Sequence, residues 1–165
     1  MNIIRGGSEV ILGRYSEIIR LNEINSIPDP DVVNEIDPRF LLGDGSIVTT
    51  GHKIDFTDRV EIGRRVILGG RNSSLWTHNR QRTRPITIGE KAYIGSEIRM
   101  APGSSIPARS IVGIGSVITA SLAEEGKLIA GVPAKIWSPD DDDNVLLVTP
   151  AAYAHELEGR LGWRS

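Results

Sequence analysis

The sequence predicts an all-β chain in which short parallel strands wind into a triangular coil, and two observations support this prediction. Glycine is abundant, with 18 residues, whereas aromatic residues make up only 5% of the chain, a balance unlike that of sandwiches or helical bundles. An aliphatic residue also returns at every sixth position of the central stretch, at Ile88, Ile94, Met100, Ile106, Val112 and Ile118. Slim side chains at this spacing suit a narrow, repetitive interior.

The period of six fits neither an α-helix nor a continuous strand with its period of two. Three such segments close one turn of a triangular coil, and successive turns stack as parallel strands about 4.8 Å apart. Tight corners are expected at Glu90-Lys91, Pro102-Gly103 and Ile114-Gly115, where polar, proline or glycine residues cluster. The same phase is found earlier, at Phe56, Ile62 and Leu68.

The remaining sequence is arranged around this repeat. We interpret residues 1–37 as an N-terminal cap and residues 38–137 as the β-helix, with an extruded loop near 71–85 where the spacing departs from a multiple of six. Residues 138–148 contain four consecutive acids and are predicted to be an acidic linker. Residues 149–165 begin with Thr-Pro and predict a short C-terminal α-helix that covers an open coil edge. Its apolar face carries Tyr153, Ala154, Leu157 and Leu161.

Composition excludes several classes of function. The net charge is -2, which gives no positive field for binding nucleic acid. The absence of cysteine removes disulfides, thiolate metal sites and a cysteine nucleophile. No run of residues approaches the length of about 18 apolar residues that a membrane span needs, so we expect no membrane span and a cytoplasmic location.

Three segments carry a likeness to a known family, and they are residues 85–96 (Pro-Ile-Thr-Ile-Gly-Glu-Lys-Ala-Tyr-Ile-Gly-Ser), residues 111–119 (Ile-Val-Gly-Ile-Gly-Ser-Val-Ile-Thr) and the exit segment 130–136 (Ala-Gly-Val-Pro-Ala-Lys-Ile). These segments resemble the hexapeptide-repeat acyltransferases, which include galactoside, maltose and polysaccharide O-acetyltransferases. The resemblance implies a left-handed parallel β-helix and a homotrimer with active sites at subunit interfaces. It also implies acetyl-CoA as co-substrate, with no metal required.

In the resembled family, a histidine in the loop before the Pro-Ile-Thr-Ile-Gly segment is the catalytic base, which points to His78. An imidazole can take the proton of a weakly nucleophilic hydroxyl as it attacks a thioester, a contribution of about 10² to 10⁴ in rate. The family also suggests that Ser96 lies beside the reacting thioester. Cofactor contacts are expected at Ile114, Thr119 and Lys135, although relatives commonly carry alanine where this chain has Ile114.

Three further residues are candidates for substrate binding. Trp76 could stack on a sugar or pack at a subunit interface, and Asn79 follows the predicted base. Asp58 is our choice among the nearby acids for the group that orients His78. The three arginines of the loop could hold an anionic acceptor or form a solvated basic surface, and they are Arg80, Arg82 and Arg84.

The sequence therefore predicts an acetyl-CoA-dependent O-acetyltransferase that acts on a saccharide hydroxyl, such as a precursor of a surface polysaccharide. The alternatives are an N-acetyltransferase acting on an amino sugar or antibiotic, and a non-catalytic β-helix scaffold. A metalloenzyme like the γ-type carbonic anhydrases fits less well, because His52 and His78 lack a third histidine at the required spacing and Thr83 stands where one is needed.

Overall fold

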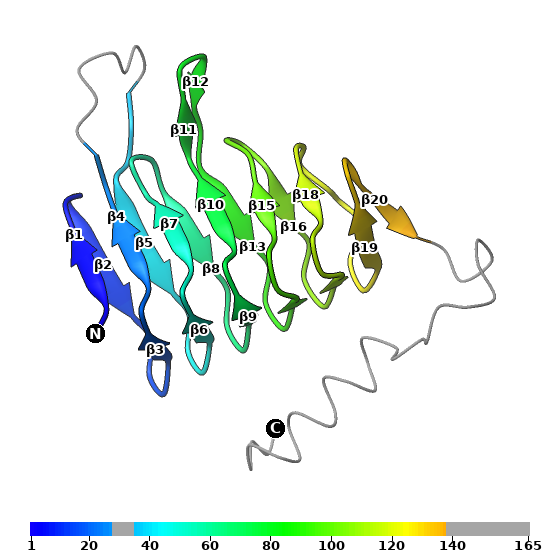
Figure 1. Cartoon of the computed structure of the whole chain (residues 1–165), viewed down its shortest axis with the longest axis horizontal. Coiled ribbons are helices and arrows are strands. Elements are labelled where there is room, and N and C mark those ends of the chain that lie inside the picture. Colours follow the sequence, from blue (N-terminus) through cyan, green and yellow to red (C-terminus); the bar gives the residue numbers. More distant parts are fainter. Residues whose placement is uncertain (28–34, 138–165) are drawn as a thin grey trace.

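Residues 1–27 and 35–137, which the computed structural model describes, form three sheets wrapped around one interior (Figure 1). Sheet A consists of β1 (Ile3–Arg5), β4 (Glu23–Asn25), β7 (Lys53–Asp55), β10 (Ser74–Trp76), β15 (Arg99–Met100) and β18 (Val117–Ile118). Sheet B consists of β2 (Glu9–Leu12), β5 (Arg39–Leu42), β8 (Val60–Ile62), β13 (Ile86–Ile88) and β16 (Ser105–Ile106). Sheet C consists of β3 (Glu17–Arg20), β6 (Ile47–Thr50), β9 (Ile67–Arg71), β14 (Tyr93–Ile94), β17 (Ile111–Val112), β19 (Leu128–Gly131) and β20 (Ala134–Trp137).

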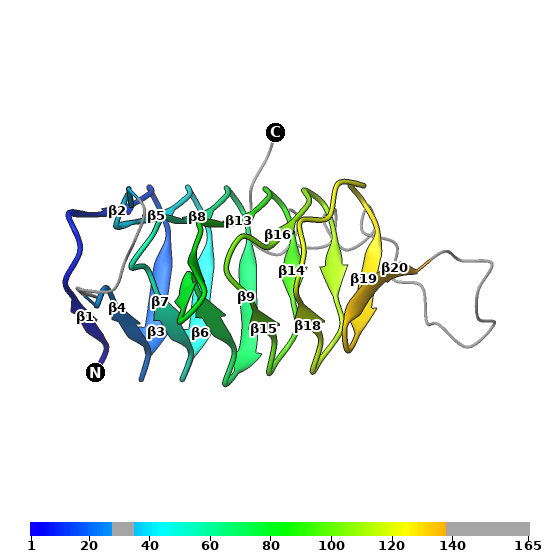
Figure 2. The same cartoon turned by 90° about the horizontal axis from the view of Figure 1, so that it is seen from above.

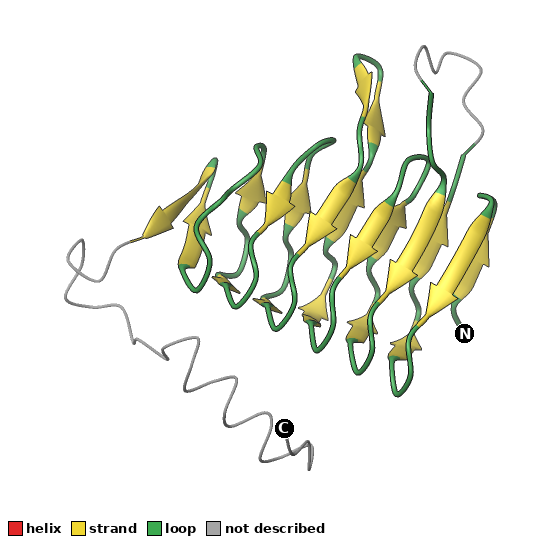
Figure 3. Ribbon diagram, turned by 180° about the vertical axis from the view of Figure 1, so that it is seen from behind, coloured by secondary structure: helices red, strands yellow, loops and turns green. Residues whose placement is uncertain are grey.

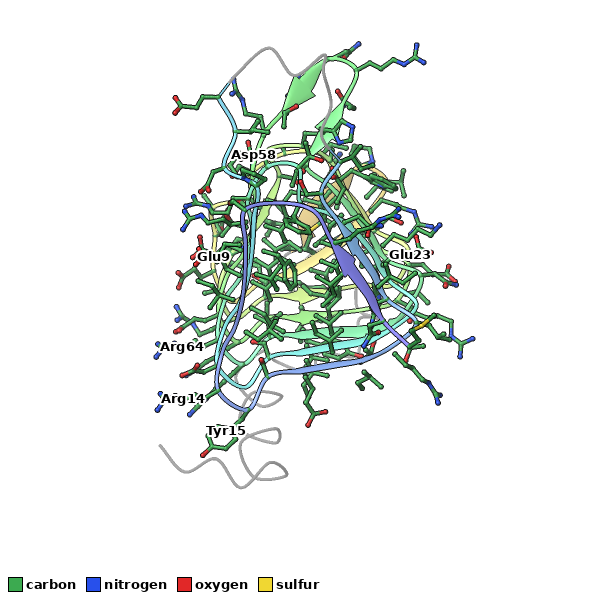
Figure 4. The ribbon with its side chains drawn as sticks, turned by 90° about the vertical axis from the view of Figure 1, so that its left-hand side faces the viewer. Glu9, Arg14, Tyr15, Glu23, Asp58 and Arg64 are labelled. Carbon is green, nitrogen blue, oxygen red and sulfur yellow. The ribbon has the colours of Figure 1, made fainter. Side chains whose placement is uncertain are left out.

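The chain visits the three sheets in turn, so that each circuit forms one coil of a prism. Neighbouring strands within the sheets are parallel, and only the last strand, β20, turns back to pair antiparallel with β19. Seen from above, the coils follow one another along a single axis (Figure 2). The view along that axis shows a triangular section filled with side chains (Figure 4). The predicted all-β fold class is confirmed.

The interior contains the aliphatic residues that the period of six identifies. All six of the predicted central positions, from Ile88 to Ile118, are at most 1% exposed. The earlier members of the same phase, Phe56, Ile62 and Leu68, are equally buried. Burying these side chains is the main favourable contribution to folding, at about 25 cal/mol per Å² of apolar surface removed from water.

The glycine that follows many of these aliphatic residues is explained by the close stacking of coils. A Cβ atom placed on Gly63 would lie 2.7 Å from the backbone nitrogen of Glu90 in the next coil. Any larger residue at this position would push two coils apart. The glycine excess in the composition thus reflects backbone packing at the corners as well as the turns themselves.

The parallel pairing begins at Ile3, well before residue 38, where the sequence analysis placed the start of the β-helix. β1 pairs with β4, β2 with β5, and β3 with β6. Three core-facing residues of this first coil remain 37–50% exposed, because no described coil precedes them. They are Ile4, Val10 and Leu12.

The predicted acidic linker, 138–148, and the predicted terminal helix, 149–165, lie outside the described residues. No helix within residues 1–27 or 35–137 is long and apolar enough to cross a bilayer.

Candidate active site

One short hairpin departs from the regular winding, at the corner between sheets A and B. It consists of β11 (His78–Asn79) and β12 (Arg82–Thr83), which pair antiparallel with His78 opposite Thr83. Figure 3 shows this pair of strands standing out from the prism next to β10. Asn79 shapes the turn, because its Oδ1 accepts the backbone N–H groups of Gln81 at 2.8 Å and Arg82 at 3.0 Å. The hairpin fixes His78 at the corner where β10 leaves sheet A.

His78 lies against the carboxylate of Asp55, which comes from the preceding coil. β10 and β7 pair in parallel register with Trp76 opposite Asp55. The ring Nδ1 of His78 is 2.8 Å from Asp55 Oδ2, and the backbone N–H of His78 donates to the same oxygen at 3.1 Å. The His78 side chain is 18% exposed, whereas that of Asp55 is 3% exposed. A buried carboxylate therefore holds one edge of a partly accessible imidazole.

Two threonines complete the surroundings of this carboxylate. Asp55 Oδ1 accepts the hydroxyl of Thr57 at 2.6 Å and its backbone N–H at 3.1 Å. Asp55 Oδ2 accepts the hydroxyl of Thr77 at 2.9 Å and its backbone N–H at 3.1 Å. These donors stabilise an ionised carboxylate in a site where water has little access. Because a carboxylate only accepts hydrogen bonds, a neutral His78 carries its proton on Nδ1 and its lone pair on Nε2.

The acid beside the imidazole is Asp55, so the choice of Asp58 as the orienting acid was wrong. The carboxylate of Asp58 accepts the backbone N–H groups of Arg59 at 2.8 Å and Asp37 at 3.1 Å. Its own backbone N–H donates to Thr77 Oγ1 at 3.0 Å. Asp58 is 6% exposed at the corner below the hairpin, where Figure 4 labels it. It organises the backbone of this corner, whereas Asp55 contacts the ring.

Trp76 and Thr119 lie on the outer side of sheet A near the same corner. Trp76 is 41% exposed, two residues before His78. Thr119 is exposed and follows β18, two strands further along the sheet, so the two side chains stand about 10 Å apart along the stacking direction. Of the residues expected to contact the cofactor, Thr119 therefore lies on the same sheet as Trp76.

The other residues expected to contact the cofactor lie elsewhere on the prism. Ser96 and Ile114 are on successive coils at the corner between sheets C and A, where the backbone N–H of Gly115 donates to the carbonyl of Ser96 at 3.0 Å. Ile114 is 73% exposed. Lys135 is exposed on β20, at the far end of sheet C. Within one chain, the structure does not bring these three residues to His78.

The loop arginines are exposed, and pairing within the hairpin separates one of them from His78. Residues directly opposite each other on antiparallel strands share one side, so His78 and Thr83 face one way while Asn79 and Arg82 face the other. Thr83 is buried and Arg82 is exposed, which agrees with this arrangement. Arg82 therefore points away from the imidazole of its own chain.

His52 is a structural residue. Its side chain is completely buried at the corner between sheets C and A. Nδ1 accepts the backbone N–H of Ser73 at 3.1 Å, and Nε2 is 3.0 Å from the hydroxyl of Thr49. Burial lowers the pKa of His52 to about 4, against a smaller opposing effect of the Leu68 carbonyl. A neutral ring at this depth has no access to an acceptor.

Within residues 1–27 and 35–137, no group of three or more His, Cys, Asp or Glu side chains could hold a metal ion. His52 and His78 belong to two different corners, each with its own hydrogen-bond partners. The arrangement around His78 suits proton transfer by an imidazole whose tautomer is fixed by a carboxylate.

Comparison with known proteins identifies the class to which this fold corresponds. Models of known protein families give no match to the chain. Galactoside O-acetyltransferase of Escherichia coli (strain K12) is 38% identical over 52 residues, which make up 32% of this chain and 25% of that protein. The chain thus spans about a quarter of the length of this curated relative.

Two solved structures extend the comparison to the fold. A hexapeptide-repeat-containing acetyltransferase from Vibrio cholerae O1 biovar eltor, complexed with acetyl coenzyme A, superimposes with a TM-score of 0.63 at 23% identity, covering 79% of this chain and 71% of that one. A perosamine N-acetyltransferase from Caulobacter crescentus, in complex with CoA and GDP-perosamine, gives a TM-score of 0.60 at 27% identity, covering 83% and 53%.

The fold is therefore the left-handed parallel β-helix of the hexapeptide-repeat acetyltransferases. The resemblance found in the three sequence segments is confirmed: this chain is similar to that family in sequence and in structure.

Proposed function

We propose that this chain is an acetyl-CoA-dependent O-acetyltransferase that acts on a saccharide hydroxyl, with His78 as general base. The observation that carries the proposal is the 2.8 Å contact between His78 Nδ1 and the buried Asp55 carboxylate, at the hairpin formed by β11 and β12. A partly exposed imidazole with a fixed tautomer is the group that this reaction requires.

The reaction balances with His78 as the only proton carrier. Nε2 accepts the hydroxyl proton while the hydroxyl oxygen forms a bond to the thioester carbonyl carbon. The negative charge that develops on the carbonyl oxygen is stabilised by a hydrogen-bond donor, a role we assign to the backbone at Ser96. The carbon–sulfur bond then breaks, and the imidazolium returns its proton to the departing sulfur, which leaves an acetyl ester and free CoA.

The active site is proposed to be shared by two subunits of a homotrimer. His78 lies at the corner between sheets A and B, whereas Ser96 and Ile114 lie at the corner between sheets C and A. A neighbouring copy can place its second corner beside the first corner of this chain, which would complete the site with Lys135 available for the phosphates of CoA. Trp76, which is exposed two residues before His78, is assigned to the acceptor side, while Asn79 and Asp58 shape the hairpin turn and the corner below it.

Free CoA can be measured with a thiol-reactive chromophore, and the chain contributes no background because it contains no cysteine. A panel of sugars and amino sugars identifies the acceptor. His78→Gln should lower turnover about 10² to 10⁴-fold, while the control His52→Asn, which alters a buried histidine at another corner, should retain turnover at pH 7.5. A His78→Gln protein with wild-type turnover would contradict the mechanism.

Subunit sharing is tested by mixing two inactive variants. The trimer should have three times the 18.0 kDa mass of the chain. When His78→Gln subunits are exchanged with Ile114→Glu subunits, some interfaces combine two intact corners, so part of the activity should return. Activity that never returns in verified mixed trimers would place the whole site within one subunit.

An amine is the second candidate acceptor, because the solved structure with 27% identity is a perosamine N-acetyltransferase. Alkaline hydroxylamine separates the two outcomes, since it cleaves acetyl esters and leaves acetamides intact. A non-catalytic scaffold would show neither turnover nor a rise in melting temperature with acetyl-CoA, and a zinc enzyme would respond to zinc instead.

A further inference from the structure

Sheet C carries a continuous column of apolar side chains on its outer side. The strand registers place Ile47 opposite Ile67, Ile67 opposite Tyr93, Tyr93 opposite Ile111, and Ile111 opposite Leu128. Each of these residues is followed in its strand by a buried core residue, so each points outward. All five side chains retain intermediate exposure. We call this column, Ile47, Ile67, Tyr93, Ile111 and Leu128, the apolar ladder.

The corresponding outward columns of the other two sheets are mainly polar over the same coils. On sheet A, the column consists of Lys53, Ser74, Arg99 and Val117. On sheet B, it consists of Leu41, Glu61, Thr87 and Ser105. Three of the four positions in each column are polar, whereas all five positions of the apolar ladder are apolar, so sheet C is the face best suited to contact with apolar side chains.

We propose that the apolar ladder is the docking surface for residues 149–165 of the same chain, lying as a helix across sheet C. The chain leaves the fold from β20, the terminal strand of this same sheet. From Ile47 to Leu128 the ladder crosses four strand spacings, about 19 Å. A helix of these 17 residues is about 25 Å long, which is enough to cover it. The 11 residues of 138–148 can reach about 36 Å, so the helix can run back along the sheet.

The sequence of 149–165 matches this surface. Tyr153, Leu157 and Leu161 recur at intervals of four residues and form one apolar stripe, while Glu156 and Glu158 fall outside it. A stripe of large apolar residues fits a ladder of five apolar side chains better than it fits the mainly polar columns of sheets A and B.

Charge favours the same placement. The turns between sheets B and C carry Arg65, Lys91 and Arg109 along one border of the ladder, and Arg109 pairs with Glu125. On a helix, Glu156 and Glu158 flank the apolar stripe on opposite sides, so one of them can approach that border. Tethering by a short linker also gives this segment an effective concentration near the millimolar range, an advantage over a second copy of the chain.

Engineered cysteines test the contact directly, because the chain has none of its own. Leu157→Cys is combined in the full-length protein with Ile67→Cys, Ile111→Cys or Leu128→Cys. Under mild oxidation, at least one pair should form a disulfide within a single chain in most molecules. The matched control combines Leu157→Cys with Thr87→Cys, which faces outward on sheet B and should not cross-link.

Three outcomes would overturn the proposal. Disulfides that join two chains through Ile67→Cys alone would show that a second copy covers the ladder. Disulfides between Leu157→Cys of one chain and the ladder of another would show exchange between subunits. Absence of cross-linking in all pairs would show that the segment lies elsewhere.

A second measurement keeps the test independent of cross-linking geometry. Leu157→Asp should expose the ladder and raise the fluorescence of a bound apolar dye several-fold, with a lower melting temperature. His155→Asp, which adds the same charge outside the apolar stripe, should change neither quantity. Equal dye binding by the two variants would contradict docking through the stripe.

Discussion

Replacing Asp55 by asparagine isolates the contribution of the carboxylate to the state of His78. The carboxylate lies 2.8 Å from His78 Nδ1 and accepts hydrogen bonds from the hydroxyl groups of Thr57 and Thr77. An asparagine has almost the same shape but presents one NH₂ group. If that group faces the ring, Nδ1 must become the acceptor and the proton moves to Nε2. If the NH₂ group faces Thr57 instead, it takes the place of the oxygen that accepts the backbone N–H of Thr57, and this N–H loses its acceptor.

The first orientation removes the lone pair from the nitrogen that must accept the substrate proton. We therefore expect Asp55→Asn to lower kcat by about 10² to 10⁴-fold, the usual contribution of general-base catalysis, with little change in KM. Because the acid is positioned behind the ring, it acts through His78 and does not touch the acceptor. The measurement is CoA release under saturating acetyl-CoA.

A structural role alone would not change the tautomer, so nitrogen NMR of histidine-labelled protein supplies the decisive readout. Wild-type His78 should carry its proton on Nδ1, and the Asp55→Asn variant should carry it on Nε2. The charge-matched control is Asp44→Asn, whose carboxylate contacts Arg14 at a solvent-exposed corner. Wild-type kcat in Asp55→Asn, or an unchanged tautomer together with reduced kcat, would refute the positioning role.

Three further results are expected. The pKa of His52 is lowered to about 4 in the folded protein, below its unfolded value of about 6.5, so the unfolded state binds the extra proton between these values. The free energy of unfolding should therefore fall by about 3 kcal/mol as pH drops from 6.5 to 4. Denaturant unfolding of His52→Asn should show a weaker dependence of this free energy on pH, and an equal dependence in the two proteins would count against the assignment. A Cβ on Gly70 would lie 1.6 Å from Ser96 Oγ, and the backbone φ of Gly70 is +64°, so Gly70→Ala should lower the melting temperature. Adding Ser96→Gly should recover part of this loss, so that the melting-temperature changes of the two single variants do not add up to that of the double variant. Asn79→Ala removes the acceptor of the hairpin turn and should lower kcat several-fold while the melting temperature barely changes; a large fall in melting temperature would show that the hairpin supports the whole prism.

The repeating part of the fold was predictable because a period of six leaves a clear pattern of aliphatic residues and glycines. Val117 pairs with Arg99, which is 18 positions earlier, as a regular coil requires. The first coil was missed because Lys53 pairs with Glu23, which is 30 positions earlier. This coil has 12 residues more than a regular coil of 18, and these extra residues interrupt the run of aliphatic residues at every sixth position.

The base was found from its place in the interruption, but its acid partner was not. Ser74 pairs with Lys53, which is 21 positions earlier, so this coil is three residues longer than a regular one. A regular coil counted back from His78 leads to residue 60, between Asp58 and Glu61 and away from Asp55. The extra residues shift Asp55 into place instead. The pair of segments Asp55-Phe56-Thr57 and Trp76-Thr77-His78 is the signal that could have revealed this register.

Since Asp55 and His78 belong to consecutive coils, their chemistry depends on one local contact between neighbours and on no distant part of the prism. Each coil touches only the coils before and after it. Gaining or losing whole turns at either end would therefore change the length of the molecule, and with it the surface offered to large acceptors, while the proton-transfer pair stayed intact.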